Sequence, residues 1–468
     1  DELKVSTQFD SNITIKVPNQ ENFATTIVDE PGATPITITN KTTSPVLLTD
    51  TINNPFGTTT IATPGDILAP ASALIRTDGL DLTAAAGQIG TLGAVLKTDT
   101  NTLQAIALKD IAITDIEGDV VVDQVATQGV VDLSVVEAIL DDDDVDATAD
   151  VSGSQINLRS QTGNIGTVDD ALEIDATDAS TGFNATALGD IVVADVADGL
   201  STGQITSVSG DIFLTLPDQV TPGQDLAVTD GSVIRAIQGA VSLDVGDNVT
   251  LAADSQLTAA QAVTIAADTD PADPDATIGA IVDLSGTIQA DTVEIQTGTD
   301  GDLVSLTNTQ AGTETTILTG DGKDIIHLGS AATPDTNTGG TLETFAAIVD
   351  VQSGDDNDAL ILDDSGDSTD NSGEIAATQV TGFGLKEGVT YSDVEDLTVN
   401  LGSGDDAIIT TSTGATGSTL VDGGLGDDEF TVKNAAGTLN DIDELLELRG
   451  NLGDDSLQVI DTGDAEDN

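Results

Sequence analysis

The stretch Val421–Thr431, VDGGLGDDEFT, predicts the fold of the C-terminal third of this chain. From Gly423 onward it fills every fixed position of the nonapeptide G-G-x-G-x-D-x-U-x, where U is a bulky apolar residue. Glycines allow the positive φ angles of a tight loop, and Asp428 adds a carboxylate. Such a loop offers only oxygen ligands, which suit a hard cation such as Ca²⁺. We expect a strand at Glu429–Val432 directly after the loop.

Five further segments repeat this pattern less completely: Thr297–Ser305, Thr319–His327, Ser353–Ile361, Gly402–Ile409 and Gly450–Gln458. The last aspartates before the six strands are 22, 34, 48, 22 and 27 residues apart. The candidate metal ligands are the paired aspartates of the six loops: Asp300, Asp302, Asp321, Asp324, Asp355, Asp358, Asp405, Asp406, Asp427, Asp428, Asp454 and Asp455. We expect the second aspartate of each pair to be the main ligand and the first to point to solvent. The alternative is a set of Gly-Asp turns that hold no metal.

These repeats resemble the haemolysin-type (RTX-like) calcium-binding repeats. The resemblance implies a calcium-binding β-solenoid over residues 297–468. The chain departs from that family because its loops come about once per 22 residues or more, whereas the family repeats every nine. We therefore expect one metal-binding edge per coil, interrupted by insertions at Ala331–Phe345 and Asp364–Tyr391.

A looser repeat, Gly-x-Ile or Gly-x-Val, opens short alternating strands between residues 61 and 296. The glycines of this repeat are Gly65, Gly87, Gly118, Gly163, Gly189, Gly210, Gly239 and Gly279. The pattern looks like the parallel β-helix repeats of filamentous-haemagglutinin-like surface adhesins, and it predicts a parallel β-helix. A stack of independent hairpins is the alternative.

Residues 1–60 alternate apolar and polar side chains between prolines, which predicts a β-rich N-terminal cap or a small β-sandwich. Helical spacing is scarce: Val131–Leu140 and Asp441–Leu448 fit two turns each, but Leu446–Leu448 also fits a strand, which we favour. The predicted fold class is therefore all-β, a right-handed parallel β-helix or β-solenoid with a β-rich N-terminal segment.

The composition excludes several functions. The 468 residues include 82 acidic and 12 basic side chains, a net charge of −70 that disfavours nucleic acids and anionic membranes. Aromatic residues make up 2% of the chain, which is few for a globular enzyme. Cysteine and methionine are absent, so no disulfide forms and the main oxidation targets are missing. No apolar run reaches the length of a membrane span. Because the chain starts at Asp1, we expect a processed form or a fragment.

Catalytic residues do not stand out. Carboxylates are too common for a pair to be informative, and the arginines at 76, 159, 235 and 449 are far apart in sequence. The single histidine, His327, is expected on the surface. The run Asp141–Asp144 with Asp146 fits either a cation site or a solvated loop.

These features together predict a secreted, bacterial-type, calcium-binding structural protein of the cell surface that is not an enzyme. It would be an adhesin stalk or a surface-layer, sheath or filament subunit. We expect self-association into a homo-oligomer or filament, with other surface proteins or polysaccharide as further partners. The alternatives are a polysaccharide-acting β-helix enzyme and the repeat domain of a larger secreted toxin or protease.

Overall fold

The computed structural model describes residues 2–6, 13–17, 24–28, 35–142, 148–270 and 279–463, the first three ranges as backbone alone. Contacts divide the chain into two compact units. Unit 1 comprises residues 1–217 and 232–240, and unit 2 comprises residues 218–231 and 241–468. The predicted boundaries at residues 60 and 296 lie inside unit 1 and unit 2, respectively.

The described residues form strands and turns and contain no helix, so the predicted all-β class is confirmed. Accordingly, none of them forms a helix able to cross a membrane.

The strands of unit 1 are β1 (Glu2–Ser6), β2 (Ile13–Val17), β3 (Ala24–Val28), β4 (Ile36–Asn40), β5 (Val46–Leu47), β6 (Ile52–Thr63), β7 (Ile67–Leu68), β8 (Ile75–Ala84), β9 (Leu96–Asp99), β10 (Thr102–Ala107), β11 (Ile111–Asp115), β12 (Val120–Ala126), β13 (Val130–Val135), β14 (Ile139–Asp141), β15 (Val151–Gly153), β16 (Gln155–Ser160), β17 (Leu172–Ala176), β18 (Phe183–Ala187), β19 (Ile191–Asp195), β20 (Gly199–Ser207) and β21 (Ile212–Leu216). Strand β22 (Asp225–Ala236) contributes residues to both units.

The strands of unit 2 are β23 (Val241–Val245), β24 (Val249–Leu251), β25 (Gln256–Ala259), β26 (Ala262–Ala267), β27 (Ile281–Leu284), β28 (Thr287–Gln289), β29 (Thr292–Gln296), β30 (Leu303–Leu306), β31 (Glu314–Leu318), β32 (Ile325–Leu328), β33 (Val349–Gln352), β34 (Ala359–Asp363), β35 (Ser372–Ala376), β36 (Gln379–Gly382), β37 (Val389–Ser392), β38 (Asp396–Asn400), β39 (Ala407–Thr410), β40 (Ser418–Asp422), β41 (Glu429–Val432), β42 (Leu445–Arg449) and β43 (Ser456–Val459).

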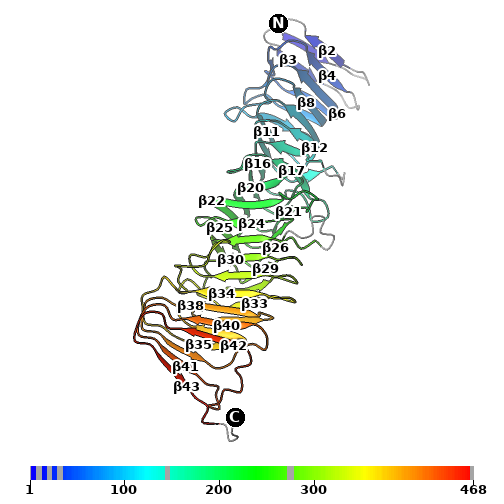
Figure 1. Cartoon of the computed structure of the whole chain (residues 1–468). Coiled ribbons are helices and arrows are strands. Elements are labelled where there is room, and N and C mark those ends of the chain that lie inside the picture. The colour runs from blue at the N-terminus through cyan, green and yellow to red at the C-terminus, as the bar shows by residue number, and fades with distance from the viewer. Residues whose placement is uncertain are drawn as a thin grey trace. The chain divides into compact units, whose positions relative to one another are not determined.

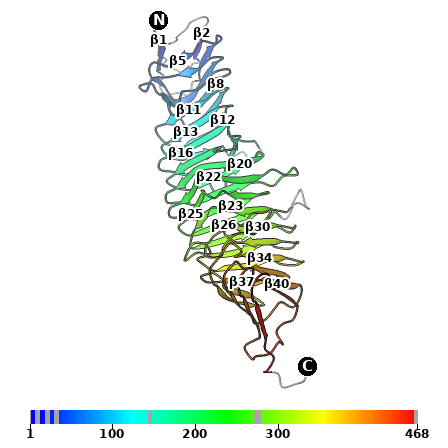
Figure 2. The same ribbon diagram turned by 60° about the vertical axis from the view of Figure 1, so that its left-hand side comes forward.

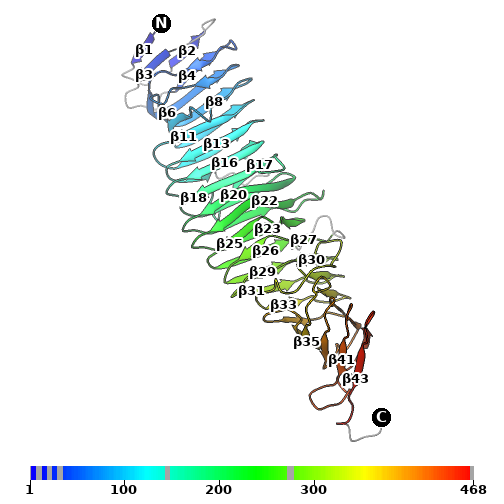
Figure 3. The same ribbon diagram turned by 90° about the vertical axis from the view of Figure 1, so that its left-hand side faces the viewer.

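Each unit is a β-solenoid in which a strand pairs in parallel with the strand one coil, or turn, earlier. In unit 1, for example, β11, β13, β16 and β18 form successive rungs (Figure 3). The register aligns Ile111 with Val131, Val131 with Ile156 and Ile156 with Phe183, and all four side chains are fully buried. Alternate residues of a strand point to opposite faces, so this register keeps apolar side chains inside on every coil. The predicted parallel β-helix or β-solenoid is thereby confirmed.

The N-terminal strands continue this parallel ladder. Strand β1 pairs with β3, and β2 with β4, both in parallel, and β3 and β4 each pair in parallel with β6. The β-rich segment predicted over residues 1–60 therefore consists of strands stacked on the coils that follow.

Two segments that also fit helical spacing are strands. Residues 131–140 lie in β13 and β14 and the turn between them, and Leu446–Leu448 lies within β42. Strand β41 covers Glu429–Val432, the span predicted from the nonapeptide. Strands β7, β12, β19, β21, β23 and β27 each begin at the apolar residue of a predicted Gly-x-Ile or Gly-x-Val marker. The period-2 pattern, not the helical one, therefore governs these segments.

Unit 2 gains a column of strands at its C-terminal end (Figure 1, Figure 2). The column β35, β39, β41, β43 begins inside residues 364–391, which the sequence predicted to be an insertion. Residues 364–388 are additional chain within one coil, because β33 pairs with β37 and β34 pairs with β38. Within the segment, β35 pairs in parallel with β39, while β36 pairs antiparallel with β35 and β37. The segment thus supplies the first rung of a new column.

Candidate metal-binding loops

The six predicted loops lie in two columns of unit 2. Loops 297–302, 319–324 and 353–358 connect the column β29, β31, β33 to the column β30, β32, β34. Loops 401–406, 423–428 and 450–455 connect the column β38, β40, β42 to the column β39, β41, β43. The loop column changes between loop 353–358 and loop 401–406. Strand β34 follows the first of these loops, and it pairs with β38, which precedes the second. The predicted loops therefore lie along two edges of unit 2, three loops on each.

The loop glycines are required by the close approach of neighbouring coils. A Cβ at Gly424 would lie 1.9 Å from the carbonyl oxygen of Gly402, and a Cβ at Gly426 would lie 2.1 Å from that of Gly404. The φ angles of Gly424 and Gly426 are +84° and +127°, a region that residues with a Cβ rarely adopt. Stacking alone thus selects glycine at these positions, with or without a metal.

The second aspartates of the pairs form an inner ladder of hydrogen bonds between coils. In the later column, the backbone N–H of Asp406 donates to Oδ1 of Asp428 at 2.9 Å, and that of Asp428 to Oδ1 of Asp455 at 3.1 Å. In the earlier column, the backbone N–H of Asp302 donates to Oδ1 of Asp324, and that of Asp324 donates to Oδ1 of Asp358, both at 2.8 Å. Each carboxylate therefore fastens its own coil to the preceding one.

The first aspartates of the later column form an outer ladder in the opposite direction. The backbone N–H of Asp427 donates to Oδ1 of Asp405 at 2.8 Å, and that of Asp454 donates to Oδ1 of Asp427 at 2.8 Å. The side chains of Asp405, Asp427 and Asp454 are exposed, as predicted for the first member of each pair.

The inner carboxylates are buried, and several lack a partner for their second oxygen. The side chains of Asp302, Asp324, Asp358, Asp406 and Asp428 are at most 2% exposed, whereas Asp455 is exposed. Oδ2 makes no hydrogen bond in Asp302, Asp324, Asp358 and Asp428. Burial raises the pKa of Asp302 and of Asp428 to about 6 and that of Asp324 to about 7, and it also raises the pKa values of Asp358 and Asp406. At neutral pH, a proton or a cation is needed to compensate these buried oxygens.

Basic side chains do not supply that cation in the described part of the chain. The ion pairs among the described residues join Arg76 to Asp99 and Glu117, and Arg449 to Glu447. The inner carboxylates therefore have no Lys or Arg partner there, although a buried charge is costly unless it is paired. Carboxylate and carbonyl oxygens are the ligands that Ca²⁺ prefers.

Unit 1 contains a similar ladder, which runs in the direction of the outer ladder and which sequence reasoning missed. Oδ1 of Asp66 accepts the N–H of Gln88 at 3.1 Å, and Oδ1 of Asn164 accepts that of Asp190 at 3.0 Å. Oδ1 of Asp190 in turn accepts the N–H of Asp211 at 2.9 Å. These acceptors are the middle residues of the Gly-x-Ile markers. The signal available in the sequence was an Asp or Asn directly before a strand, which both kinds of repeat share.

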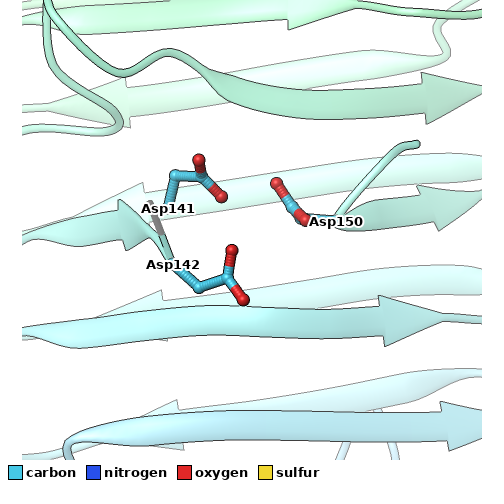
Figure 4. Close-up of side chains that lie close together, drawn as sticks. All are labelled: Asp141, Asp142 and Asp150. Atoms are coloured by element: carbon cyan, nitrogen blue, oxygen red, sulfur yellow. The ribbon is translucent and has the colours of Figure 1, made fainter. Parts of the chain in front are cut away.

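Two described groups of three carboxylates have ligand oxygens that all lie within 4.8 Å of one another, and neither contains any of the twelve predicted ligands. One group is Glu343, Asp364 and Asp367 in unit 2. Here Asp364 accepts hydrogen bonds of 2.9 Å from the N–H of Leu342 and from Nδ2 of Asn371, so its burial is compensated. The other group is Asp141, Asp142 and Asp150 in unit 1 (Figure 4). The rest of the acidic run noted in the sequence, Asp143, Asp144 and Asp146, lies outside the described residues.

His327 is not a surface residue, contrary to the prediction. It lies on β32, its side chain is buried, and its Nδ1 is 2.8 Å from the carbonyl oxygen of Thr333. Residues 331–345, which follow β32, thus cover a side chain that the sequence pattern placed at an outward position.

Comparisons of the chain with family models, with curated proteins and with solved structures give no match. Function is therefore inferred from the loops, their charges and the stacking of the strands.

Proposed function

We propose that this chain is an extracellular, calcium-binding structural protein of a cell surface, serving as an adhesin stalk or as a surface-layer, sheath or filament subunit. One observation carries the proposal: buried aspartates recur from coil to coil, and no described Lys or Arg pairs with them. Four of them, Asp302, Asp324, Asp358 and Asp428, have an oxygen without a hydrogen-bond partner. Calcium ions supply the missing positive charge.

The chemistry of the loops favours calcium over other metals. The candidate ligands are carboxylate oxygens and the carbonyl oxygens of glycine-rich turns, and hard cations prefer oxygen ligands. Zinc and copper sites use histidine and cysteine, and this chain has one histidine and no cysteine. The resemblance of the loops to haemolysin-type repeats supports the same ion. In each loop the second aspartate is the main side-chain ligand, and backbone carbonyls complete the shell.

A location outside the cell follows from the affinity expected of such loops. Extracellular calcium modules bind at about 10⁻⁴–10⁻³ M, so their sites fill outside the cell and stay empty in a cytosol. The absence of cysteine and methionine suits an oxidising exterior. A stack of coils whose repeated residues serve coil-to-coil contacts suits a structural role better than a catalytic one.

Self-association with a second copy of the chain is part of this proposal. Among the described strands, β42 pairs with β40 alone and β43 with β41 alone, so each leaves one edge unpaired. Leu445, Leu457 and Val459 on these strands are 64%, 58% and 54% exposed. An exposed strand edge with apolar side chains recruits a strand from another molecule, and the stacked coils of a second copy offer strands of matching spacing.

Electron microscopy of the full chain in calcium and in excess chelator tests this function. We expect filaments or sheets in calcium that disperse when calcium is removed. Isolated molecules under both conditions would contradict the structural role. Assemblies that survive chelation would separate self-association from calcium binding.

A further inference from the structure

The carboxylate group Asp141, Asp142 and Asp150 lies at the end of β14 and directly before β15, in unit 1. Strand β14 pairs with the first half of β12, aligning Asp141 with Val122, and β15 pairs with the second half, aligning Val151 with Val125. Asp141, Asp142 and Asp150 are held close together because β14 and β15 are both paired with β12.

The three carboxylates converge on one space. Figure 4 shows the carboxylates of Asp141 and Asp142 on one side facing that of Asp150 on the other. One oxygen from each lies within 4.8 Å of the others. Because Ca²⁺–oxygen distances are about 2.4 Å, oxygens on opposite sides of one ion are about 4.8 Å apart. The spacing therefore fits ligands of a single ion.

A fourth carboxylate comes from the next coil. Strand β17 pairs with β15, aligning Ile174 with Val151, and the N–H of Asp150 donates to the carbonyl oxygen of Glu173 at 3.1 Å. Burial, followed by the charge of Asp141, raises the pKa of Glu173.

The buried oxygens of this cluster lack hydrogen-bond partners. The Asp141 side chain is 5% exposed, and neither of its oxygens has a partner. The same holds for Oδ2 of Asp150 and Oε2 of Glu173. None of these groups takes part in a described ion pair. Polar atoms buried in this way are rare in folded proteins and indicate a ligand or a proton.

A proton alone accounts for the cluster less well than a cation. A proton on one carboxyl group would give a partner to only some of the four unpartnered oxygens of Asp141, Asp150 and Glu173. A divalent ion compensates more charge than a proton does and gives the orphaned oxygens of Asp141 a partner.

We propose that Asp141, Asp142 and Asp150 bind one Ca²⁺ ion in unit 1. The ligands are all oxygens, and the chain offers no His or Cys ligand in this group, which favours a hard cation. The ion links Asp141 and Asp142, at the end of β14, to Asp150, which directly precedes β15. This site is independent of the loops of unit 2 and does not rest on the proposed function.

Calcium binding by the full chain, measured by equilibrium dialysis after chelator treatment, tests the site. We expect Asp141→Asn and Asp150→Asn each to remove one bound ion per chain. The matched control is Asp78→Asn, an exposed carboxylate in the same unit whose Oδ1 accepts a bond from Asn101, and it should bind as many ions as the wild type. Equal calcium binding by all four proteins would overturn the proposal.

Thermal unfolding keeps the test decisive if a variant is unstable. In chelator, Asp150→Asn should melt above the wild type, because it removes repulsion from an empty site. In calcium, the order should reverse, because only the wild type gains binding energy. The same increase in melting temperature with and without calcium would contradict the proposal and identify the cluster as protonated carboxyl groups. If the unit 2 loops bind nothing, the wild type would hold the single ion that these variants lose, so the two proposals fail separately.

Discussion

The backbone amide of Asp406 donates a 2.9 Å hydrogen bond to Oδ1 of Asp428 in the following coil. One coil further on, the amide of Asp428 donates to Asp455 in the same way. These aspartates thus accept hydrogen bonds from the backbone of the neighbouring coil, and these contacts need no metal. A calcium ion would engage the remaining oxygen, so the two roles can be separated by substitution.

Substitutions at Asp428 separate its role as a hydrogen-bond acceptor from its role as a calcium ligand. Asp428→Ala removes both the acceptor and the charge, and it leaves the buried N–H of Asp406 unpaired at a cost of about 1–3 kcal/mol. Asp428→Asn keeps an acceptor oxygen and should therefore lose less stability in chelator than Asp428→Ala. Both variants should lose most of the stabilisation that calcium confers on unit 2, as measured by chemical denaturation with and without calcium.

The matched control is Asp427→Ala, because Asp427 also accepts one N–H bond, from Asp454, but is exposed. Water can replace its hydrogen bond, so we expect a smaller loss of stability and a calcium affinity closer to that of the wild type. Equal calcium binding by the Asp427→Ala and Asp428→Ala variants would refute the assignment of the second aspartate as the main ligand.

Glycine substitutions test the close approach of coils. Gly424→Ala would place a Cβ 1.9 Å from the carbonyl oxygen of Gly402 at a φ of +84°. Gly437 has a φ of +72°, but the nearest atom to its Cβ would be 3.9 Å away. We expect Gly437→Ala to cost about 1–2 kcal/mol for its backbone conformation and Gly424→Ala to cost clearly more. Similar unfolding midpoints for the two variants would show that the coils tolerate separation at this edge.

The pH dependence of unit 1 should report on Asp115. Its Oδ2 accepts bonds from the hydroxyl of Thr98 at 2.9 Å and the N–H of Thr100 at 3.0 Å, while burial raises its pKa to about 6. The folded state binds a proton more tightly than the unfolded state does. The resulting stability is complete below about pH 4 and is lost as pH rises through about 6.

Urea denaturation of the wild type and of Asp115→Asn at pH 4.5 and pH 7 measures this effect. The amide does not titrate, so the variant should lose less stability than the wild type between the two pH values. The difference should approach 2–3 kcal/mol, at about 1.4 kcal/mol per unit of pKa shift. An identical pH dependence in the two proteins would mean that Asp115 stays ionised when buried.

Self-association through β43 should depend on its exposed apolar side chains. Leu457→Lys places a charge on a strand with an unpaired edge and should shift sedimentation in millimolar calcium towards the monomer. Ile409→Lys is the control, because Ile409 is 36% exposed on β39, which has a described neighbour on each side. A wild type that stays monomeric at every concentration would rule out this interface.

The sequence predicted the strands better than the stacking. Phe430, Leu397 and Val399 alternate with polar residues, and this period-2 pattern places them in strands with buried side chains. Spacing along the chain does not fix which strands become neighbours, so the change of loop column between Asp358 and Asp406 could not be foreseen. The only sign of this change in the sequence is the interval of 48 residues between Asp358 and Asp406.

The sequence identified the loop residues but did not reveal their contacts with the neighbouring coil. Glycine and aspartate were interpreted as ligand chemistry, whereas Gly424 is required by the carbonyl of Gly402 and Asp428 by the amide of Asp406. Both requirements come from a neighbour about one coil away, which local sequence does not display. The cluster of Glu343, Asp364 and Asp367 was missed for the same reason, since its members meet only through the fold.

Thermal unfolding of the full chain, followed by circular dichroism at neutral pH, tests calcium-dependent folding most directly. The signal is recorded in excess chelator and again after calcium is restored. We predict that chelation weakens the β-signal of residues 297–460 and lowers the melting temperature of unit 2, because the buried carboxylates then repel one another uncompensated. Restored calcium should reverse both changes. An unchanged β-signal and an unchanged melting temperature in chelator would show that the loops are plain turns, held by their glycines and aspartate ladders without metal.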